Sequence, residues 1–357
     1  MHAPRDPRPV TPPLAELEAC AAMLRQGSRT FHAASKLLPA RVRAPAIALY
    51  AFCRQADDAV DIAGSAEALA ALHRRLERAA AGAPDDGPVD RAFAWALSTY
   101  GVPVELPTAL LEGFAWDLEG RRCATMSDLR AYAARVAGSV GAMMAVLMGT
   151  RDPATLSCAC ELGIAMQLTN VARDVGEDAR MGRCYLPLDW MREEGIDVDG
   201  WIAAPAPTPA IARLTGRVLD AADRHYAAAA PGIARLPLDC RAGISVAARL
   251  YAEIGEEVRR AGLDSVTRRA VVSSSRKAAI VSLAAFGSVR VPAAASDDVT
   301  PSPEAAFLVS AARQAPPPAP RGLEARVGWL VDLFERLERR ESVEPMPASR
   351  AAPPARA

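Results

Sequence analysis

The sequence predicts an all-α fold with one main domain, and three observations support this prediction. The 357-residue chain is rich in alanine and has only 5% aromatic residues, a composition that favours closely packed helices over sheets. Between residues 14 and 287, apolar residues recur at helical spacing, and these stretches alternate with short breakers of glycine and proline. The same region has no hairpin signal and no strand-like alternation. We therefore expect about ten helices in one continuous domain.

Composition divides the chain into parts that we expect to behave differently. The start is proline-rich and has no apolar signal core. A proline cluster with many Ala and Ser residues follows the main domain and is typical of a linker, although the short apolar patch at 305–309 can pack locally. The predicted parts are a disordered leader at 1–13, a helical domain at 14–290, a linker at 291–321, an amphipathic helix at 322–341 and a disordered tail at 342–357.

Charge and cysteine content exclude several classes of protein. The 42 basic residues balance the 42 acidic ones, so there is no general attraction to nucleic acid, and we expect no nucleic-acid partner. Seven scattered cysteines do not form a disulfide framework; we expect reduced thiols and a cytoplasmic protein. No run reaches the ~18 apolar residues that a membrane-spanning helix needs.

Two aspartate motifs of the form D-x-x-x-D lie inside apolar helical patterns. At 100° per residue, the two aspartates of each motif are about 40° apart and share one helix face. Polar residues on the preceding turns extend both faces within about 80° of arc. The first motif is Asp57 and Asp61, extended by Tyr50 and Arg54; the second is Asp174 and Asp178, extended by Gln167 and Asn170.

Paired carboxylates on one helix face repel each other and are costly to bury. A single motif could be a solvated surface face. Two motifs, the second completed by Gln167 and Asn170, better fit a site for hard divalent cations. Mg²⁺ binds a few carboxylate oxygens together with phosphate oxygens and water. The sequence therefore predicts two carboxylate helices that bind diphosphates through Mg²⁺, with Mn²⁺ as a possible substitute.

Arginines near these motifs are candidates for contact with phosphate, because guanidinium groups bind phosphate oxygens in pairs. Each of them could also be an ordinary surface charge, and position beside a motif favours Arg54 and Arg173 most. The candidates are Arg29, Arg54, Arg173, and Arg268 with Arg269 before Lys277.

Other motifs argue against alternative chemistries. The segment 136–141 has two glycines in a helical pattern but no preceding strand, so it is not a dinucleotide fingerprint. We expect its small residues to permit close helix packing or to leave room for a substrate. The four histidines are isolated from one another, which disfavours acid–base catalysis by histidine.

These segments together resemble the phytoene/squalene synthase family, and within it the bacterial phytoene synthases. The resemblance covers residues 14–287 and fades beyond 290. The matching segments are Ser28 to Phe31, Ala48 to Arg54, Val136 to Gly141, Gln167 to Asp178, Gly182 to Pro187, and Tyr251 with Arg268, Arg269 and Lys277.

The resemblance implies an isoprenoid synthase fold, with helices around a central cavity, and assigns roles by position. It makes 14–290 the catalytic domain. The residues that it associates with the metal are Asp57, Asp61, Asn170, Asp174 and Asp178, of which the four aspartates are catalytic together with Tyr251. The residues that it associates with substrate are Ser28, Arg29, Thr30, Arg54, Gln167, Asn170, Arg173 and Arg268, with Tyr251 beside the diphosphate.

The implied activity is a prenyl transfer in carotenoid biosynthesis. Two geranylgeranyl diphosphates condense head to head through a cyclopropyl diphosphate to phytoene, with no NAD(P)H. The alternatives are a C30 squalene or dehydrosqualene synthase that uses farnesyl diphosphate, and a non-catalytic helical scaffold. Gly27 and Ala134 stand where some C30 relatives carry His and Tyr, which favours the C40 product.

Both the implied substrate and the implied product are lipids. We therefore expect peripheral membrane contact without insertion, and possible contact with neighbouring carotenoid-pathway enzymes. The 322–341 helix is either a strut docked on the main domain or a site of membrane or partner contact.

Overall fold

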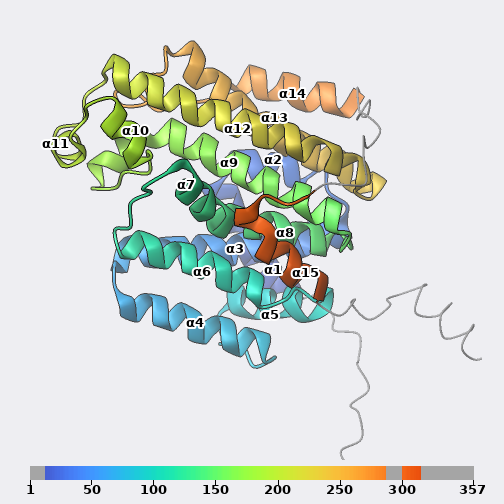
Figure 1. Ribbon diagram of the computed structural model, residues 1–357. Helices are drawn as coiled ribbons and strands as arrows, with labels where there is room; N and C mark the ends of the chain where they lie inside the picture. Colours follow the sequence, from blue (N-terminus) through green and yellow to red (C-terminus); the bar gives the residue numbers. More distant parts are fainter. Residues whose placement is uncertain (1–12, 287–299, 315–357) are drawn as a thin grey trace, which may run out of the picture. The chain divides into compact units, whose positions relative to one another are not determined.

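The computed structural model describes residues 13–286 and 300–314, and every regular element in these residues is helical (Figure 1). This confirms the all-α prediction. The expected number of about ten helices was too low, because the described residues also include short helices of six or seven residues. The N-terminal half contains α1 Leu14–Gly27, α2 Arg29–Ser35, α3 Ala40–Ala63, α4 Ala66–Ala80, α5 Pro88–Tyr100, α6 Glu105–Leu118, α7 Met126–Ala133, the π-helix η1 Ala134–Gly138 and α8 Ser139–Leu147. The remainder contains α9 Pro153–Arg180, α10 Leu188–Glu193, α11 Val198–Ala203, α12 Pro209–Arg235, α13 Leu238–Arg260, α14 Ser274–Phe286, the 3₁₀ turn η2 Pro303–Ala305 and α15 Ala306–Gln314.

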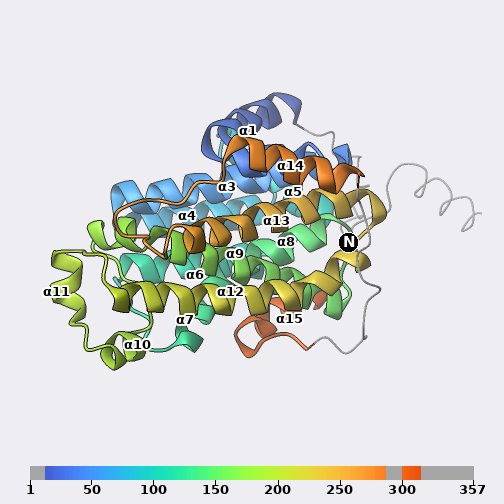
Figure 2. The same cartoon turned by 90° about the horizontal axis from the view of Figure 1, so that it is seen from above.

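Helix α9 is the centre of the main unit. It contacts α12 along much of its length and also packs against α8, α13 and η1 (Figures 1 and 2). It begins where Asp152 caps it: the carboxylate accepts a hydrogen bond from Thr155 N at 2.9 Å, and Pro153 occupies the first turn. Because α9 has neighbours on several sides, most of its apolar residues are buried. The second aspartate motif therefore lies on a firmly supported helix.

Two glycines allow α9 to approach η1 and α8 at backbone distance. A Cβ atom on Gly163 would lie 2.2 Å from the carbonyl oxygen of Ala137, and one on Gly141 would lie 2.1 Å from that of Ala159. No larger residue fits at either position without a shift of backbone. This confirms close helix packing as a role of segment 136–141. The π-helical turn falls in the same region, and such turns are often found near functional sites.

Helix α3 carries the first motif and accommodates a proline in its interior. Pro45 has no N–H, so it cannot donate to the carbonyl of Arg41 four residues earlier. The hydroxyl of Tyr100, at the end of α5, donates to that carbonyl oxygen at 2.5 Å. A tertiary contact thus replaces the missing helical hydrogen bond and joins α3 to α5.

The structure differs from the linker prediction over residues 303–314. Here α15 packs against α9, α6 and α8, and η2 packs against α7, η1 and α9. Four apolar side chains of this segment recur at helical spacing, and all four are buried. Glu304 accepts hydrogen bonds from Ser127 Oγ at 2.7 Å and from Arg130 Nε at 3.1 Å. The apolar patch predicted at 305–309 is part of this helix. The four buried residues are Ala305, Leu308, Val309 and Ala312.

Several sequence predictions lie outside the described residues. These are the leader at 1–12, the helix at 322–341 and the tail at 342–357. Among the described helices, none is long and apolar enough to cross a bilayer.

Candidate functional site

The first motif lies in the C-terminal half of α3 and is partly open to solvent. Arg54 contacts Asp57 at 3.7 Å but pairs more closely with Asp58, at 2.6 Å between guanidinium nitrogen and carboxylate oxygen. About half of the Asp57 and Arg54 side-chain surface is exposed. Asp61 lies one turn further along the same helix, but its side chain is outside the described part of the structure.

The start of α2 faces α3 through an aromatic contact. The ring of Phe31 lies 6.2 Å from that of Tyr50 on α3 and 5.2 Å from that of Tyr251 on α13. Ser28, a predicted substrate contact, caps α2 by accepting a hydrogen bond from Phe31 N at 3.1 Å. Thr30 is half-buried in the first turn, whereas the side chain of Arg29 is outside the described part.

The second motif is held by two arginines. Asp174 accepts two hydrogen bonds from Arg173, at 2.7 and 2.5 Å, and two from Arg269, at 2.7 and 3.2 Å. Burial raises the pKa of the Asp174 carboxyl, but these two guanidinium groups outweigh burial and hold the pKa below its usual value. Asp174 is therefore an anion with its charge already balanced by cations.

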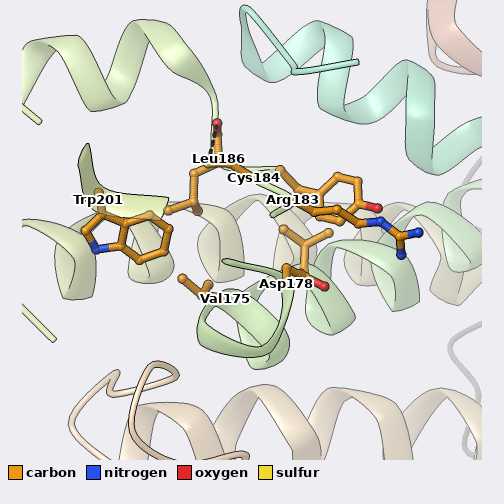
Figure 3. Close-up of a pocket in the computed structure, with 8 residues that line it drawn as sticks. Val175, Asp178, Arg183, Cys184, Leu186 and Trp201 are labelled. Carbon is orange, nitrogen blue, oxygen red and sulfur yellow. Dashed lines mark hydrogen bonds between the residues drawn. The ribbon is translucent and has the colours of Figure 1, made fainter. Parts of the chain in front are cut away.

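Asp178, one turn later, has the opposite character. Burial and then the charge of Asp174 raise the pKa of Asp178 to about 8, with Arg183 acting against the rise. Asp178 also lines a small pocket between the C-terminal half of α9 and the segment that follows it. Figure 3 shows Val175 and Asp178 on one side of this pocket, with Leu186 and Trp201 on the other.

The polar companions of the second motif are also in place. Asn170 Nδ2 donates to Gln167 Oε1 at 3.4 Å. Within the described residues, the buried Oδ1 atom of Asn170 has no hydrogen-bond partner, and such an atom is costly unless a ligand or solvent reaches it. The face of Asn170, Asp174 and Asp178 thus offers oxygen donors, which hard divalent cations prefer. The described side chains do not include a ready cluster of three carboxylate, His or Cys ligands.

Of two adjacent arginines, the structure places Arg269 rather than Arg268 at the motif. Arg269 also contacts Glu177 Oε2 at 3.2 Å. Arg268, the predicted substrate contact, is exposed and donates to the backbone carbonyl of Ala261. The sequence names Arg269 as a neighbour but contains no signal that distinguishes it from Arg268.

Tyr251 on α13 links the two motifs. Burial raises the pKa of its phenol to about 12. The positive charge of Arg173 on α9 lowers the pKa of Tyr251. Tyr50 on α3 and Asp174 on α9 both raise it. The predicted residues on α2, α3, α9 and α13 therefore form one region, whose second motif is well defined and whose first is partly described.

Comparison with known proteins agrees with this arrangement. The sequence model of the squalene/phytoene synthase family matches residues 24–276. The phytoene synthase of Rhodobacter capsulatus is 53% identical over 305 residues, covering 84% of this chain and 90% of that protein. The phytoene synthase of Cereibacter sphaeroides is 50% identical over 337 residues, covering 89% and 94%.

A solved structure gives the same result for the fold. The crystal structure of a dehydrosqualene synthase in complex with ligand superposes with a TM-score of 0.71 and 29% identity, covering 77% of this chain and 96% of that one. With 24–276 matched by the family model and relatives at 50% identity or more over most of both chains, the protein belongs to the squalene/phytoene synthase family.

Proposed function

We propose that this enzyme is a prenyltransferase that condenses two geranylgeranyl diphosphates head to head to phytoene, through a cyclopropyl diphosphate. The observation that carries the proposal is the identity of 53% and 50% to two phytoene synthases over about nine-tenths of their length. A C30 activity is the second candidate, favoured by structural relatives that include a dehydrosqualene synthase and a squalene synthase. Intact carboxylates in both motifs argue against a non-catalytic scaffold.

The residues of the second motif fit a divalent cation, which we propose to be Mg²⁺, with Mn²⁺ able to replace it. Asn170, Asp174 and Asp178 would hold it together with Asp57 and Asp61. Their donors are all oxygens, one of them the Oδ1 of Asn170, which has no hydrogen-bond partner among the described residues. When bound, such a cation stabilises the negative charge of a departing diphosphate. The buried carboxyl of Asp178 gains a counter-charge in the same event.

The protein's own groups supply the rest of the chemistry. Arg173 and Arg269 stand where a diphosphate would approach Asp174, and their guanidinium groups suit bidentate phosphate contact. The surrounding apolar helices exclude water from the allylic cation, so that carbon rather than solvent attacks it. The condensation to phytoene involves no hydride transfer, so we expect no NAD(P)H.

A product assay tests this proposal. Purified protein with Mg²⁺ and mild detergent receives labelled C15 or C20 diphosphate separately. A C40 hydrocarbon from the C20 substrate, lost in Asp57→Ala and Asp174→Ala, is the expected result. A C30 hydrocarbon from the C15 substrate alone would show that the substrate is farnesyl diphosphate. The absence of product from both substrates would refute a catalytic role.

A matched pair of variants tests the diphosphate contacts. Arg269→Gln removes a guanidinium group from Asp174, and Arg268→Gln removes the neighbouring one, which donates to a backbone carbonyl. We expect Arg269→Gln to lower kcat/KM by about 100-fold, the size of a lost charge-assisted contact. Arg268→Gln should stay near wild type. If Arg268→Gln lowered kcat/KM more than Arg269→Gln did, Arg268 would be the diphosphate contact, as the family resemblance implied.

We also propose that the enzyme works in the cytoplasm at the membrane surface, in contact with neighbouring carotenoid-pathway enzymes. Its seven cysteines form no disulfide, and its proposed substrate and product are lipids. Fractionation of gently lysed cells tests this placement: membrane-bound protein released by salt or mild detergent would support it, and complete recovery without membranes would contradict it.

A further inference from the structure

A loop segment lies against the second motif, and its contact with α9 is made of backbone. Ser265 O accepts a hydrogen bond from Gly176 N at 2.9 Å, and Gly176 stands between the two aspartates of the motif. We call residues 263–269, which follow α13 and end at Arg269, the 263–269 strap. Ser265 is buried, and its hydroxyl has no hydrogen-bond partner among the described residues. The strap is therefore held at this point through its main chain.

This contact depends on the absence of a side chain at Gly176. A Cβ atom there would lie 2.4 Å from the carbonyl oxygen of Val266 and 2.6 Å from its Cα, and both are backbone atoms. A change of side-chain rotamer cannot relieve such an overlap. Val266 is also buried in the core, and its carbonyl oxygen accepts a hydrogen bond from Arg180 Nη1 at 3.1 Å. A larger residue at 176 would therefore push the 263–269 strap away from α9.

The first residues of the strap fix its conformation. Leu263 has a left-handed backbone, with a φ of 61°, which turns the chain after the end of α13. Asp264 Oδ1 then accepts hydrogen bonds from the N–H groups of Val266 and Thr267, at 3.0 and 2.9 Å, and Asp264 Oδ2 accepts one from the Thr267 hydroxyl. A turn closed by a side chain in this way leaves the residues that follow little freedom. The strap thus reaches Gly176 in one defined shape.

The other end of the strap carries an arginine of the site. Arg269 lies three residues beyond Val266 and donates to both carboxylate oxygens of Asp174, at 2.7 and 3.2 Å. About half of its side-chain surface is exposed, so side-chain packing does little to order it. A free arginine side chain has many rotamers, and the position of its backbone decides which of them reach the motif. A fixed strap therefore lowers the cost of ordering Arg269 when an anion binds.

We propose that the 263–269 strap, docked on Gly176 and closed by Asp264, is a positioning element that holds Arg269 for diphosphate. Gly176 and Asp264 are then positioning residues, which act on the anion only through Arg269. The inference rests on one part of the proposed function, the contact between Arg269 and diphosphate. Within the second motif, the carboxylates supply oxygen donors, and the glycine between them admits the strap that supplies the positive charge.

Binding of inorganic diphosphate tests this role without turnover. Isothermal titration calorimetry in a buffer that contains Mg²⁺ measures its Kd for the full chain and for each variant. Asp264→Ala and Asp264→Asn form a matched pair, because both remove the same charge but only asparagine keeps a side-chain oxygen that accepts from the two backbone N–H groups. Gly176→Ala displaces the strap from the other side of the contact. The Asp264 pair leaves α9 unchanged, so it decides the question even for a Gly176→Ala protein that does not fold.

We expect Asp264→Ala and Gly176→Ala each to raise the Kd about 10-fold, as Arg269→Gln should, because each takes a charge-assisted hydrogen bond from the anion. Asp264→Asn should bind like wild type. Adding Asp264→Ala or Gly176→Ala to Arg269→Gln should cause no further loss, because the displaced strap no longer carries a guanidinium group. General damage to the fold would instead weaken binding again in these double variants.

Equal binding by Asp264→Ala and Asp264→Asn, with weaker binding by Arg269→Gln, would overturn this role of the strap. Additive losses in the double variants would also overturn it. Wild-type affinity in Arg269→Gln would show that this arginine does not contact diphosphate, and the role of the strap would fall with that contact. A wild-type protein that makes no C40 hydrocarbon would refute the proposed function, whereas the Kd values would still decide what the strap does.

Discussion

Replacing Gly163 by alanine should separate α9 from the π-helical turn η1. The added Cβ would lie 2.2 Å from Ala137 O and 2.8 Å from Gly138 Cα, both backbone atoms, whereas ordinary contact begins at 3.4 Å, a shortfall of about 1.2 Å. Alanine in place of glycine favours a helix by ~1 kcal/mol, but overpacking against a rigid wall costs ~1–3 kcal/mol and occasionally more. We expect a net loss of up to about 2 kcal/mol.

Denaturant unfolding of both proteins measures this difference, and the control is Gly216→Ala on α12. There the nearest atom to a new Cβ is the flexible end of Leu263 at 3.3 Å, so the helical gain should dominate and stability should stay level or rise by up to ~1 kcal/mol. Phytoene formation should fall in Gly163→Ala, because η1 moves away from α9. If Gly163→Ala is as stable as Gly216→Ala, the helices do not approach at backbone distance and the reasoning is wrong.

Three further predictions follow from other contacts. Folding raises the pKa of Asp178 from 3.8 to about 8, so the folded protein binds a proton that the unfolded chain releases, and its stability falls as pH rises between these values. In a buffer that contains a metal chelator, the melting temperature of Asp178→Asn should therefore exceed that of wild type by a margin that grows from pH 5 to 9. Leu308→Ala should lower the free energy of unfolding by about 3 kcal/mol, because the side chain is fully buried, as denaturant titration will measure. Tyr100→Phe should cost about 1 kcal/mol, and less in a Pro45→Ala background, where the introduced alanine supplies an N–H to the Arg41 carbonyl.

Each of these has an outcome that would contradict it. Parallel pH profiles for wild type and Asp178→Asn would mean that the carboxyl is charged throughout the range. A Leu308→Ala protein as stable as wild type would place α15 away from the core. Additive effects of the Tyr100 and Pro45 changes would show that the hydroxyl does not replace the missing helical hydrogen bond.

The aspartate helices were predictable from sequence because their information is local. Helical spacing alone places Asp174 and Asp178 on one face with Asn170, and the structure keeps them on one buried helix. The choice between Arg268 and Arg269 is different. It depends on the loop after α13, where Leu263 has a left-handed backbone and Asp264 Oδ1 accepts hydrogen bonds from the N–H groups of Val266 and Thr267. No periodicity encodes which side chain such a loop directs inward.

Contacts between distant segments were also beyond sequence reasoning. Gly176 and Ser265 come from separate elements, and neither of them lies in a repeating pattern that would indicate their backbone contact. The composition after residue 290 predicted a linker, and this obscured the four buried apolar residues of η2 and α15. Short helices that are stabilised by docking rather than by length leave a weak signal.

The position of α15 bears on what counts as one folding unit in this family. The family match ends at residue 276, yet Leu308 lies 3.4 Å from the position of a Cβ on Gly138 in η1, and Ser302 N donates to the buried carboxylate of Glu161 at 3.2 Å. A chain shortened to the matched region would expose apolar surface on α9 and leave that carboxylate without one of its donors. A shortened enzyme would therefore have a loosened core around α9, the helix that carries the second motif.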